Sequence, residues 1–293
     1  MKPESPARMR DSLDAKFRSH STTGRLDAGQ LRRRFVFQRV LRRLGAAGGW
    51  VLKGGFLLEV RIPVGARATK DMDFATAPAQ SQDELIERIE DALDVDDDGD
   101  FLMFSVRQVK ANRPDRRGLA SWSVSVRADL DGREFDRIKL DIAERLDEID
   151  GGTEVFTVPP VVEMDGLGAA ALPAVDVCQH AAEKFHALCL EFDDGRPNTR
   201  TKDLIDVVLL FEAGLIPHER LATRIRWVFL QRDQTAPPPR LPNFPASWEA
   251  DYEFLAKDLD IGISAVAEAH SVAQRIYQQA VAGLLEAPKE GTN

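Results

Sequence analysis

The hydrophobic pattern of this chain changes at Pro159-Pro160, and the change limits the folds that the chain can adopt. Before these prolines, short apolar runs of alternating polarity predict strands, and Asp131-Gly132 predicts a hairpin turn between two of them. The predicted strands cover residues 50–52, 68–75, 101–109, 122–128 and 138–143. Behind the prolines, apolar residues recur at helical spacing over residues 175–191, 203–213, 219–231 and 249–285.

The sequence therefore predicts an α+β protein in which a lobe with a mixed sheet precedes a mainly helical lobe. We expect the first lobe over residues 28–160 and the second over residues 161–286. Residues 1–27 are polar and contain Pro3 and Pro6, which predicts a basic flexible arm. Between the strands, helices are expected over residues 56–61 and 83–93, and an amphipathic helix over residues 27–44.

Charge is distributed unevenly along the chain. The formal net charge is -9, which argues against a nucleic-acid partner, because phosphate backbones are bound by Lys and Arg. The first 45 residues, however, hold twelve Lys and Arg against four Asp and Glu. A phosphate backbone could follow the arginines of this segment, although a solvated helix face or a surface for an acidic protein explains them equally well. These arginines are Arg32, Arg33, Arg34, Arg39, Arg42 and Arg43.

Cysteine content and hydropathy indicate the compartment. The two cysteines, Cys178 and Cys189, lack the spacing of a metal site, which favours a reducing environment. No run of eighteen apolar residues occurs, and the N-terminus has no apolar signal-peptide core. We therefore expect a soluble cytoplasmic protein without a membrane partner.

The segment with the clearest chemical content contains Asp71 and Asp73. Residues two apart on a strand face the same side, so these carboxylates would project together while Met72 and Phe74 enter the core. Two adjacent carboxylates repel each other, and hard oxygen donors favour magnesium or manganese as the compensating cation. Taken alone, the motif also fits two solvated aspartates in a turn.

Asp141 is a candidate third carboxylate. It lies on the predicted strand 138–143, on the opposite parity to the apolar residues Ile138, Leu140 and Ile142. Three carboxylates on neighbouring strands can hold two metal ions that activate a hydroxyl and neutralise pyrophosphate. The alternative is a strand residue that only faces solvent.

Lys53-Gly54-Gly55 follows a predicted strand and opens a predicted helix. Glycines at such a place let backbone N–H groups approach a triphosphate, and a helix N-terminus favours an anion. The chain contains no GxxxxGK[ST] motif, which excludes a P-loop. A simple turn is the alternative explanation for the two glycines.

The helical lobe carries a second set of polar residues. Lys184 precedes the segment Arg200-Thr201-Lys202-Asp203, and Asp206 follows one turn later. A lysine here can meet phosphates, whereas an ordinary ion pair between Lys202 and Asp206 at i,i+4 is the alternative. His186 has no partner at metal spacing, which predicts a packed or surface histidine.

The order of these motifs resembles that of the AbiEii/AbiGii type IV toxin family of nucleotidyltransferases, which includes the mycobacterial MenT toxins. The match spans about residues 50 to 212, and the ordered set is more specific than any of its members. The matching motifs are Lys53-Gly54-Gly55, Arg67-x-Thr69-Lys70-Asp71-x-Asp73, Asp141, Lys184 and Arg200-x-Lys202-Asp203-x-x-Asp206.

The resemblance implies a polymerase-beta-like lobe, with the helical lobe completing the active-site cleft, and a role for each matched residue. Asp71, Asp73 and Asp141 would bind Mg²⁺ or Mn²⁺, Lys184 would bind the triphosphate, and Asp203 would be a required carboxylate. The remaining matched residues would bind the nucleotide: Lys53, Gly54, Gly55, Arg67, Thr69, Lys70, Arg200, Lys202 and Asp206. Many relatives have Ser or Thr after the two glycines, whereas this chain has Phe56, which removes a hydroxyl contact to phosphate.

The resemblance also implies a function. Such an enzyme would use a nucleoside triphosphate, transfer a nucleotide to the 3′ end of transfer RNA, release pyrophosphate and inhibit translation, and a cognate antitoxin would restrain it. A nucleotidyltransferase or kinase-like enzyme that modifies a protein or small molecule would have the same site residues. A catalytically silent module that binds nucleic acid or a partner is the alternative from another class.

Overall fold

The computed structural model describes residues 3–23, 26–62, 69–95, 98–114, 117–192 and 195–285. The chain divides into two compact units, which are described separately below. Unit 1 comprises Met1–Val60, Ala68–Asp147 and Glu154–Ala174, and unit 2 comprises Arg61–Arg67, Glu148–Thr153 and Val175–Asn293.

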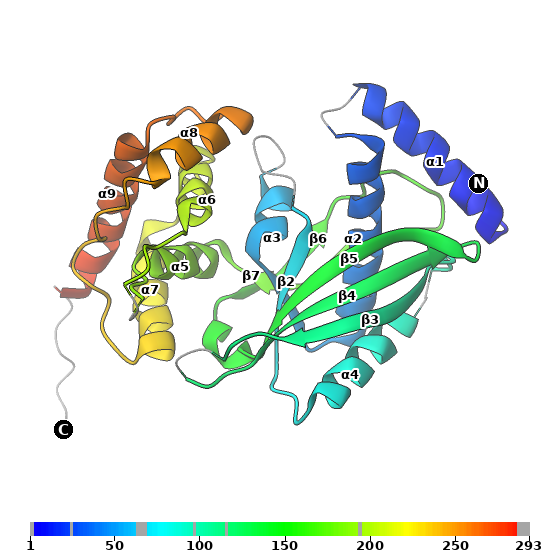
Figure 1. Cartoon of the computed structure of the whole chain (residues 1–293), viewed down its shortest axis with the longest axis horizontal. Helices are drawn as coiled ribbons and strands as arrows, with labels where there is room; N and C mark the ends of the chain where they lie inside the picture. The colour runs from blue at the N-terminus through cyan, green and yellow to red at the C-terminus, as the bar shows by residue number, and fades with distance from the viewer. Residues whose placement is uncertain are drawn as a thin grey trace. The chain divides into compact units, whose positions relative to one another are not determined.

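Unit 1 is built on a mixed sheet of seven described strands in the order β3-β4-β5-β2-β1-β7-β6 (Figure 1). The strands are β1 Trp50–Lys53, β2 Asp71–Thr76, β3 Met103–Ala111, β4 Ser121–Leu130, β5 Arg133–Ala143, β6 Thr153–Val158 and β7 Ala170–Val175. β2 runs parallel to β5 and β1 parallel to β7, while β1–β2, β3–β4 and β4–β5 are antiparallel. The predicted α+β fold class with a mixed sheet is confirmed.

Two strands, β6 and β7, are absent from the sequence prediction. β7 contains Pro173, which argues against a strand in a sequence pattern, and β6 is a short edge strand with mostly exposed side chains. β7 nevertheless pairs with β1 through Leu52 and Ala174. The predicted lobe boundary at residue 160 therefore falls inside unit 1, which continues to Ala174.

Helices cover the apolar face of the sheet. α2 (Ala28–Ala47) packs on β5, α4 (Gln82–Asp94) packs on β3, and α3 (Gly54–Arg61) follows β1 directly. A capping box between Asp27 and Gln30 fixes the start of α2 by satisfying free backbone N–H groups.

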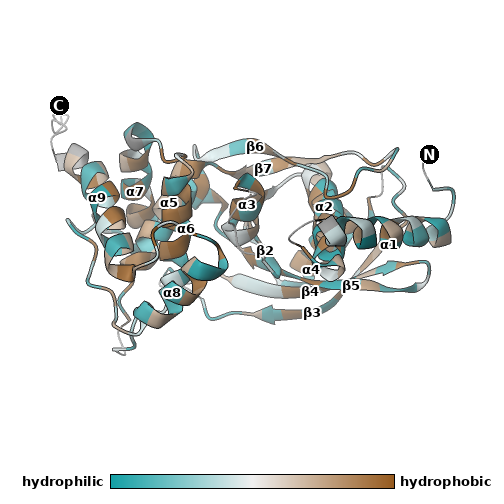
Figure 2. Cartoon of the chain, turned by 90° about the horizontal axis from the view of Figure 1, so that it is seen from above, coloured by the Kyte–Doolittle hydropathy of each residue, from teal (hydrophilic) through white to brown (hydrophobic). Residues whose placement is uncertain are grey.

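Residues 6–23 form a helix, which corrects the prediction of a flexible arm. In α1 (Pro6–Thr23), Met9, Leu13 and Phe17 are at most 1% exposed. Figure 2 shows α1 as a helix of mixed hydropathy, with hydrophobic residues among hydrophilic ones. Residues four apart share one helix face, so three apolar side chains suffice to dock α1 on α2 although the segment reads as polar.

Unit 2 is mainly helical, as predicted. Its helices are α5 Val177–Leu188, α6 Thr201–Glu212, α7 His218–Asp233, α8 Trp248–Asp258 and α9 Val266–Leu285. The interrupted helical segment predicted over residues 249–285 consists of α8 and α9. Asp260, in the connection between them, has a positive φ, which is incompatible with a continuing right-handed helix. Among the described helices, none is both long and apolar enough to cross a membrane.

Candidate active site

Asp71 and Asp73 lie on β2, and their side chains project from one face of the sheet. The register of β2 with β5 pairs Asp73 with Asp141, so all three carboxylates belong to the same face. The alternate residues Met72 and Phe74 are fully buried. The structure thus places these residues on the faces that strand parity predicts.

Lys139 introduces a positive charge among the carboxylates. Its Nζ lies 2.6 Å from Asp141 Oδ2 and 4.0 Å from Asp71 Oδ2. Partial burial disfavours the charged amine, but the hydrogen bond to Asp141 and the charges of Asp141, Asp71 and Asp73 outweigh it and raise the pKa of Lys139. On the other side, Ser123 Oγ donates a hydrogen bond to Asp141 Oδ1 at 2.6 Å. Both oxygens of Asp141 are therefore engaged by protein groups.

Asp71, Asp73 and Asp141 share one face of the sheet, and metal binding by these three carboxylates stays a prediction. Within the described residues, no group of three acidic, histidine or cysteine side chains is arranged to hold a metal ion. The two oxygens of Asp141 contact Ser123 and Lys139. Asp71 and Asp73 still offer hard oxygen donors on one face, and the ammonium beside Asp71 shows that this face accommodates a cation. Mg²⁺ is commonly held by one or two carboxylates with phosphate and water oxygens completing its shell, and this donor pair fits such an ion.

The glycine turn lies against this carboxylate pair. Lys53 ends β1 and pairs with Asp73, and Gly54 begins α3 with a φ of +68°. A Cβ on Gly54 would lie 1.9 Å from Asp73 Oδ2, so only glycine fits here. Gly55 is the next residue of the helix and is buried. The predicted strand–turn–helix arrangement is therefore present, and its backbone approaches the carboxylates closely.

We expect Gly54→Ala to lower both stability and activity. The substitution forces a left-handed φ on alanine, at about 1–2 kcal/mol, and displaces the Asp73 side chain. The matched control is Gly132→Ala, because Gly132 has a φ of +67° and no atom within 4 Å of an added Cβ. Thermal melting and nucleotide transfer measured for both variants check the prediction. Equal losses of activity in the two variants would contradict a specific role for the contact between Gly54 and Asp73.

Phe56 occupies the position where many relatives have a hydroxyl residue. Its ring is 1% exposed and packs edge-on against Phe37, with the centroids 5.0 Å apart. The side chain therefore belongs to the hydrophobic core, and the backbone of the turn carries whatever contact to phosphate the turn makes.

Glu59 anchors the chain just before Asp71. Its buried carboxylate accepts a hydrogen bond from the Thr69 backbone N–H at 2.6 Å and one from Arg34 Nε at 2.6 Å. Thr69 is partly buried, and Lys70 next to it is exposed. Arg67, a predicted nucleotide-binding residue, lies outside the described residues.

In unit 2, two carboxylates of α6 enclose Lys184 of α5. Its Nζ lies 2.7 Å from both Asp203 Oδ1 and Asp206 Oδ2. Burial disfavours the ammonium, but the charges of Asp203 and Asp206 and the hydrogen bonds to them outweigh it and raise the pKa of Lys184. Lys184 is therefore charged, and α5 and α6 are tied together at this point.

The burial of Asp206 and its ion-pair partner differ from those that the sequence suggested. Its side chain is fully buried, and it pairs with Lys184 in place of the expected alternative partner Lys202, which is exposed. Arg200 occupies the N-cap position of α6 without a side-chain capping hydrogen bond, and its Nη1 lies 4.0 Å from Asp203 Oδ2. At the start of α6, Arg200 and Lys202 are therefore exposed, whereas the buried Asp206 forms an ion pair with Lys184.

His186 is a packed histidine, as predicted. Its ring is buried, meets Phe229 edge-on, and its Nε2 lies 3.0 Å from Asp233 Oδ2. Burial and the nearby charge of Arg232 lower its pKa to about 4. The imidazole is therefore neutral near pH 7.

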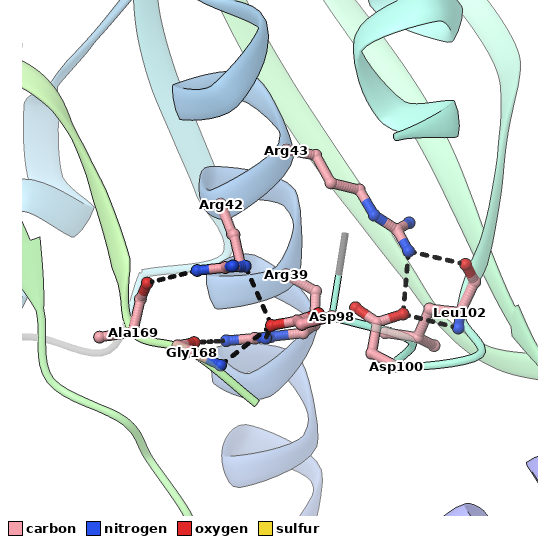
Figure 3. Close-up of polar contacts among 8 residues, drawn as sticks. All are labelled: Arg39, Arg42, Arg43, Asp98, Asp100, Leu102, Gly168 and Ala169. Carbon is pink, nitrogen blue, oxygen red and sulfur yellow. Dashed lines mark hydrogen bonds and ion pairs between the residues drawn. The ribbon is translucent and has the colours of Figure 1, made fainter. Parts of the chain in front are cut away.

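The arginines in the second half of α2 are ion-paired within unit 1 (Figure 3). Arg39 Nη1 and Arg42 Nε each lie 2.9 Å from Asp98 Oδ2, and Arg43 Nη2 lies 2.9 Å from Asp100 Oδ1. The side chains of Arg39 and Arg43 are only 3% exposed. All three arginines also donate hydrogen bonds to backbone carbonyls, which connect α2 to the segments around residues 102 and 168. The carbonyl acceptors are Gly168 for Arg39, Ala169 for Arg42 and Leu102 for Arg43.

The arginines in the first half of α2 are also paired with acidic side chains. The pairs are Arg32–Asp14, Arg33–Asp136 and Arg34–Glu59. The fold therefore supplies a counter-charge for each arginine of this segment, and binding of a phosphate backbone by these arginines stays a prediction. A count of charges along the sequence cannot reveal partners that lie up to 103 residues away.

Sequence reasoning assigned no role to Ser123 and Glu59. Strand parity could have marked Ser123, because it alternates with the apolar residues Trp122 and Val124 on β4. Glu59 gives no such signal, since a glutamate on a short helix usually faces solvent.

The fold is similar to that of a known nucleotidyltransferase toxin. MenT4, a nucleotidyltransferase toxin from Mycobacterium tuberculosis H37Rv, superposes with a TM-score of 0.50 at 17% sequence identity, over 94% of this chain and 91% of that one. JHP933 from Helicobacter pylori gives a TM-score of 0.43 at 15% identity, over 88% of this chain and 94% of that one. No curated protein matches the chain in sequence.

The family follows from a sequence profile. The profile of the family described as "Nucleotidyl transferase AbiEii toxin, Type IV TA system" matches residues 34–276. The chain belongs to this family and is a nucleotidyltransferase of the toxin–antitoxin class. The resemblance inferred from the order of the motifs is confirmed.

Proposed function

We propose that this protein transfers a nucleotide from a nucleoside triphosphate to the 3′ end of transfer RNA and thereby inhibits translation. The observation that carries the proposal is the carboxylate pair Asp71 and Asp73 on one face of β2, with Gly54 directly against it. Family membership supports the reaction class. The choice of acceptor rests on the resemblance to the MenT toxins, and the cognate antitoxin is the proposed protein partner.

In this proposal, Asp71 and Asp73 would hold Mg²⁺ or Mn²⁺, and the ion would supply positive charge to the phosphates. The backbone at the start of α3 approaches the phosphates, because Gly54 has no side chain and the N–H groups of a helix N-terminus favour anions. Lys139 and Ser123 hold Asp141 in a fixed orientation beside this pair.

The bonds exchanged are those of a single phosphoryl substitution. The acceptor 3′ oxygen forms a bond to the α-phosphorus, the bond from that phosphorus to the bridging oxygen breaks, and pyrophosphate leaves with the electron pair. The hydroxyl proton passes to solvent. Lys184, kept charged by Asp203 and Asp206, provides a cation for the triphosphate, and Arg200 and Lys202 at the start of α6 add to it.

A transfer assay tests this function. The protein is incubated with each nucleoside triphosphate, labelled at the α-phosphate, and with total RNA, in the presence of Mg²⁺ or of a chelator. We expect label in the transfer RNA fraction with one or more of the nucleotides, and none with the chelator. Label that appears on protein or on a small molecule, with RNA unlabelled, would contradict the proposal.

A further inference from the structure

A group of exposed basic residues lies on the edge strand β3 and the loop that follows it. Arg107, Lys110 and Arg113, here called the β3 basic surface, are all exposed. Throughout the described residues, no acidic side chain forms an ion pair with any of these three. They differ in this respect from the arginines of α2, whose charges are matched inside the fold.

The sheet register connects this surface to the carboxylates. Lys110 pairs with Ser123, Ser123 with Asp141, Asp141 with Asp73, and Asp73 with Lys53. Paired residues lie side by side on one face, and neighbouring strands are about 4.8 Å apart. Lys110 is therefore about 10 Å from Asp141 and about 15 Å from Asp73, along one polar row.

Local structure fixes both ends of the β3 basic surface. The pairing of β3 with β4 shifts register between Val106 and Gln108, and such a bulge re-aims the side chain of the extra residue, Arg107. Asn112 Nδ2 lies 3.4 Å from Ser123 Oγ, which ties the beginning of the loop with Arg113 to the polar row. The surface is therefore anchored to the residue that orients Asp141.

We propose that the β3 basic surface binds the phosphate backbone of the acceptor RNA near its 3′ end and that the end continues along the polar row to Asp73. The inference rests on the proposed function, because it assigns a surface to the acceptor of that reaction. Uncompensated Lys and Arg charges bind a polyanion by releasing its counterions. RNA is favoured over an acidic protein because the surface is continuous with the row that contains the site carboxylates, which the acceptor end must reach.

The test compares two triple variants with the same loss of charge. Arg107, Lys110 and Arg113 are changed to Gln in the first, and the exposed residues Arg226, Arg240 and Lys257 are changed to Gln in the control. Binding of fluorescently labelled transfer RNA is measured by anisotropy over a series of salt concentrations, without nucleotide. Thermal melting of each variant checks the fold, and the single reversal Lys110→Glu provides a milder second variant.

We expect the first triple variant to bind transfer RNA at least about tenfold more weakly than the parent near 0.1 M salt. The slope of log K against log salt concentration should decrease in magnitude by about 2 to 3, the change expected for the loss of three phosphate contacts. Lys110→Glu should shift binding in the same direction, and the control should bind nearly as the parent does. In transfer assays, KM for RNA should rise with KM for the nucleotide unchanged.

Unchanged RNA affinity and salt slope in the first variant would overturn the inference. Binding of polyglutamate, an acidic polypeptide, is measured in the same way. If the first variant loses polyglutamate binding but retains RNA binding, the inference is overturned and the surface is assigned to an acidic protein. Because RNA binding is measured without nucleotide, a parent protein that binds RNA through this surface but transfers nothing would refute the proposed function and leave this inference standing.

Discussion

Asp71→Asn is expected to reduce nucleotide transfer by at least about a hundredfold, the scale of loss when one group that stabilises a transition state is removed. The amide is isosteric but lacks the charge that a divalent cation needs. The Asp71 side chain is 38% exposed, and Lys139 lies at 4.0 Å, so the change creates no cavity and removes only a weak ion pair. The free energy of unfolding should change by less than about 0.5 kcal/mol.

Transfer of α-labelled nucleotide to transfer RNA, measured beside thermal melting, checks this expectation. The matched control is Asp91→Asn, which removes the same charge from an exposed aspartate on α4, outside the proposed site. The control should retain parent activity. An Asp71→Asn protein that melts normally and keeps near-parent transfer would contradict a role for Asp71 as a metal ligand.

Lys184→Met is expected to have two large effects, one on stability and one on activity. The ammonium is the counter-charge of Asp206, whose side chain is fully buried, and breaking a buried pair by removing one partner costs about 3–5 kcal/mol. Transfer should also collapse, because the proposed cation for the triphosphate is lost. Thermal melting and KM for the nucleotide measure the two effects.

The double variant Lys184→Met with Asp206→Asn separates these effects. It removes the buried carboxylate charge together with the ammonium, so most of the lost stability should return. Transfer should remain low, since the cation is still absent. If the double variant recovers transfer together with stability, Lys184 only holds α5 to α6, and its proposed contact with the nucleotide is wrong.

The parts of the fold that the sequence predicted are those with a strong periodic signal. Alternation around Met72 and Phe74 gave the buried face of β2, and Asp131-Gly132 gave the β4–β5 hairpin. The helix α1 was not predicted, because its three large apolar residues, Met9, Leu13 and Phe17, form only a narrow stripe in a polar segment of eighteen residues. β7 was not predicted, because a proline within the segment argues against a strand. The strand forms through its pairing with β1, which is distant in sequence.

For the candidate site, the sequence predicted which face of the sheet each carboxylate occupies, but not the contacts that depend on tertiary packing. Strand parity placed Asp71, Asp73 and Asp141 on one face, since that depends only on neighbours in sequence. The engagement of Asp141 by Ser123 depends on the order of the strands, which periodicity does not give. Likewise, the burial of Asp206 follows from the packing of α5 on α6, whereas the sequence suggested a partner four residues away.

The central claim, transfer of a nucleotide to the end of an RNA, is tested most directly by mass spectrometry of the 3′-terminal fragments of transfer RNA after incubation with the protein, Mg²⁺ and nucleoside triphosphates. We predict that the terminal fragment gains the mass of one or more nucleoside monophosphates with the parent protein and is unchanged with Asp71→Asn. An unmodified 3′ end together with nucleotide consumed, and label recovered on protein or on a small molecule, would contradict the claim.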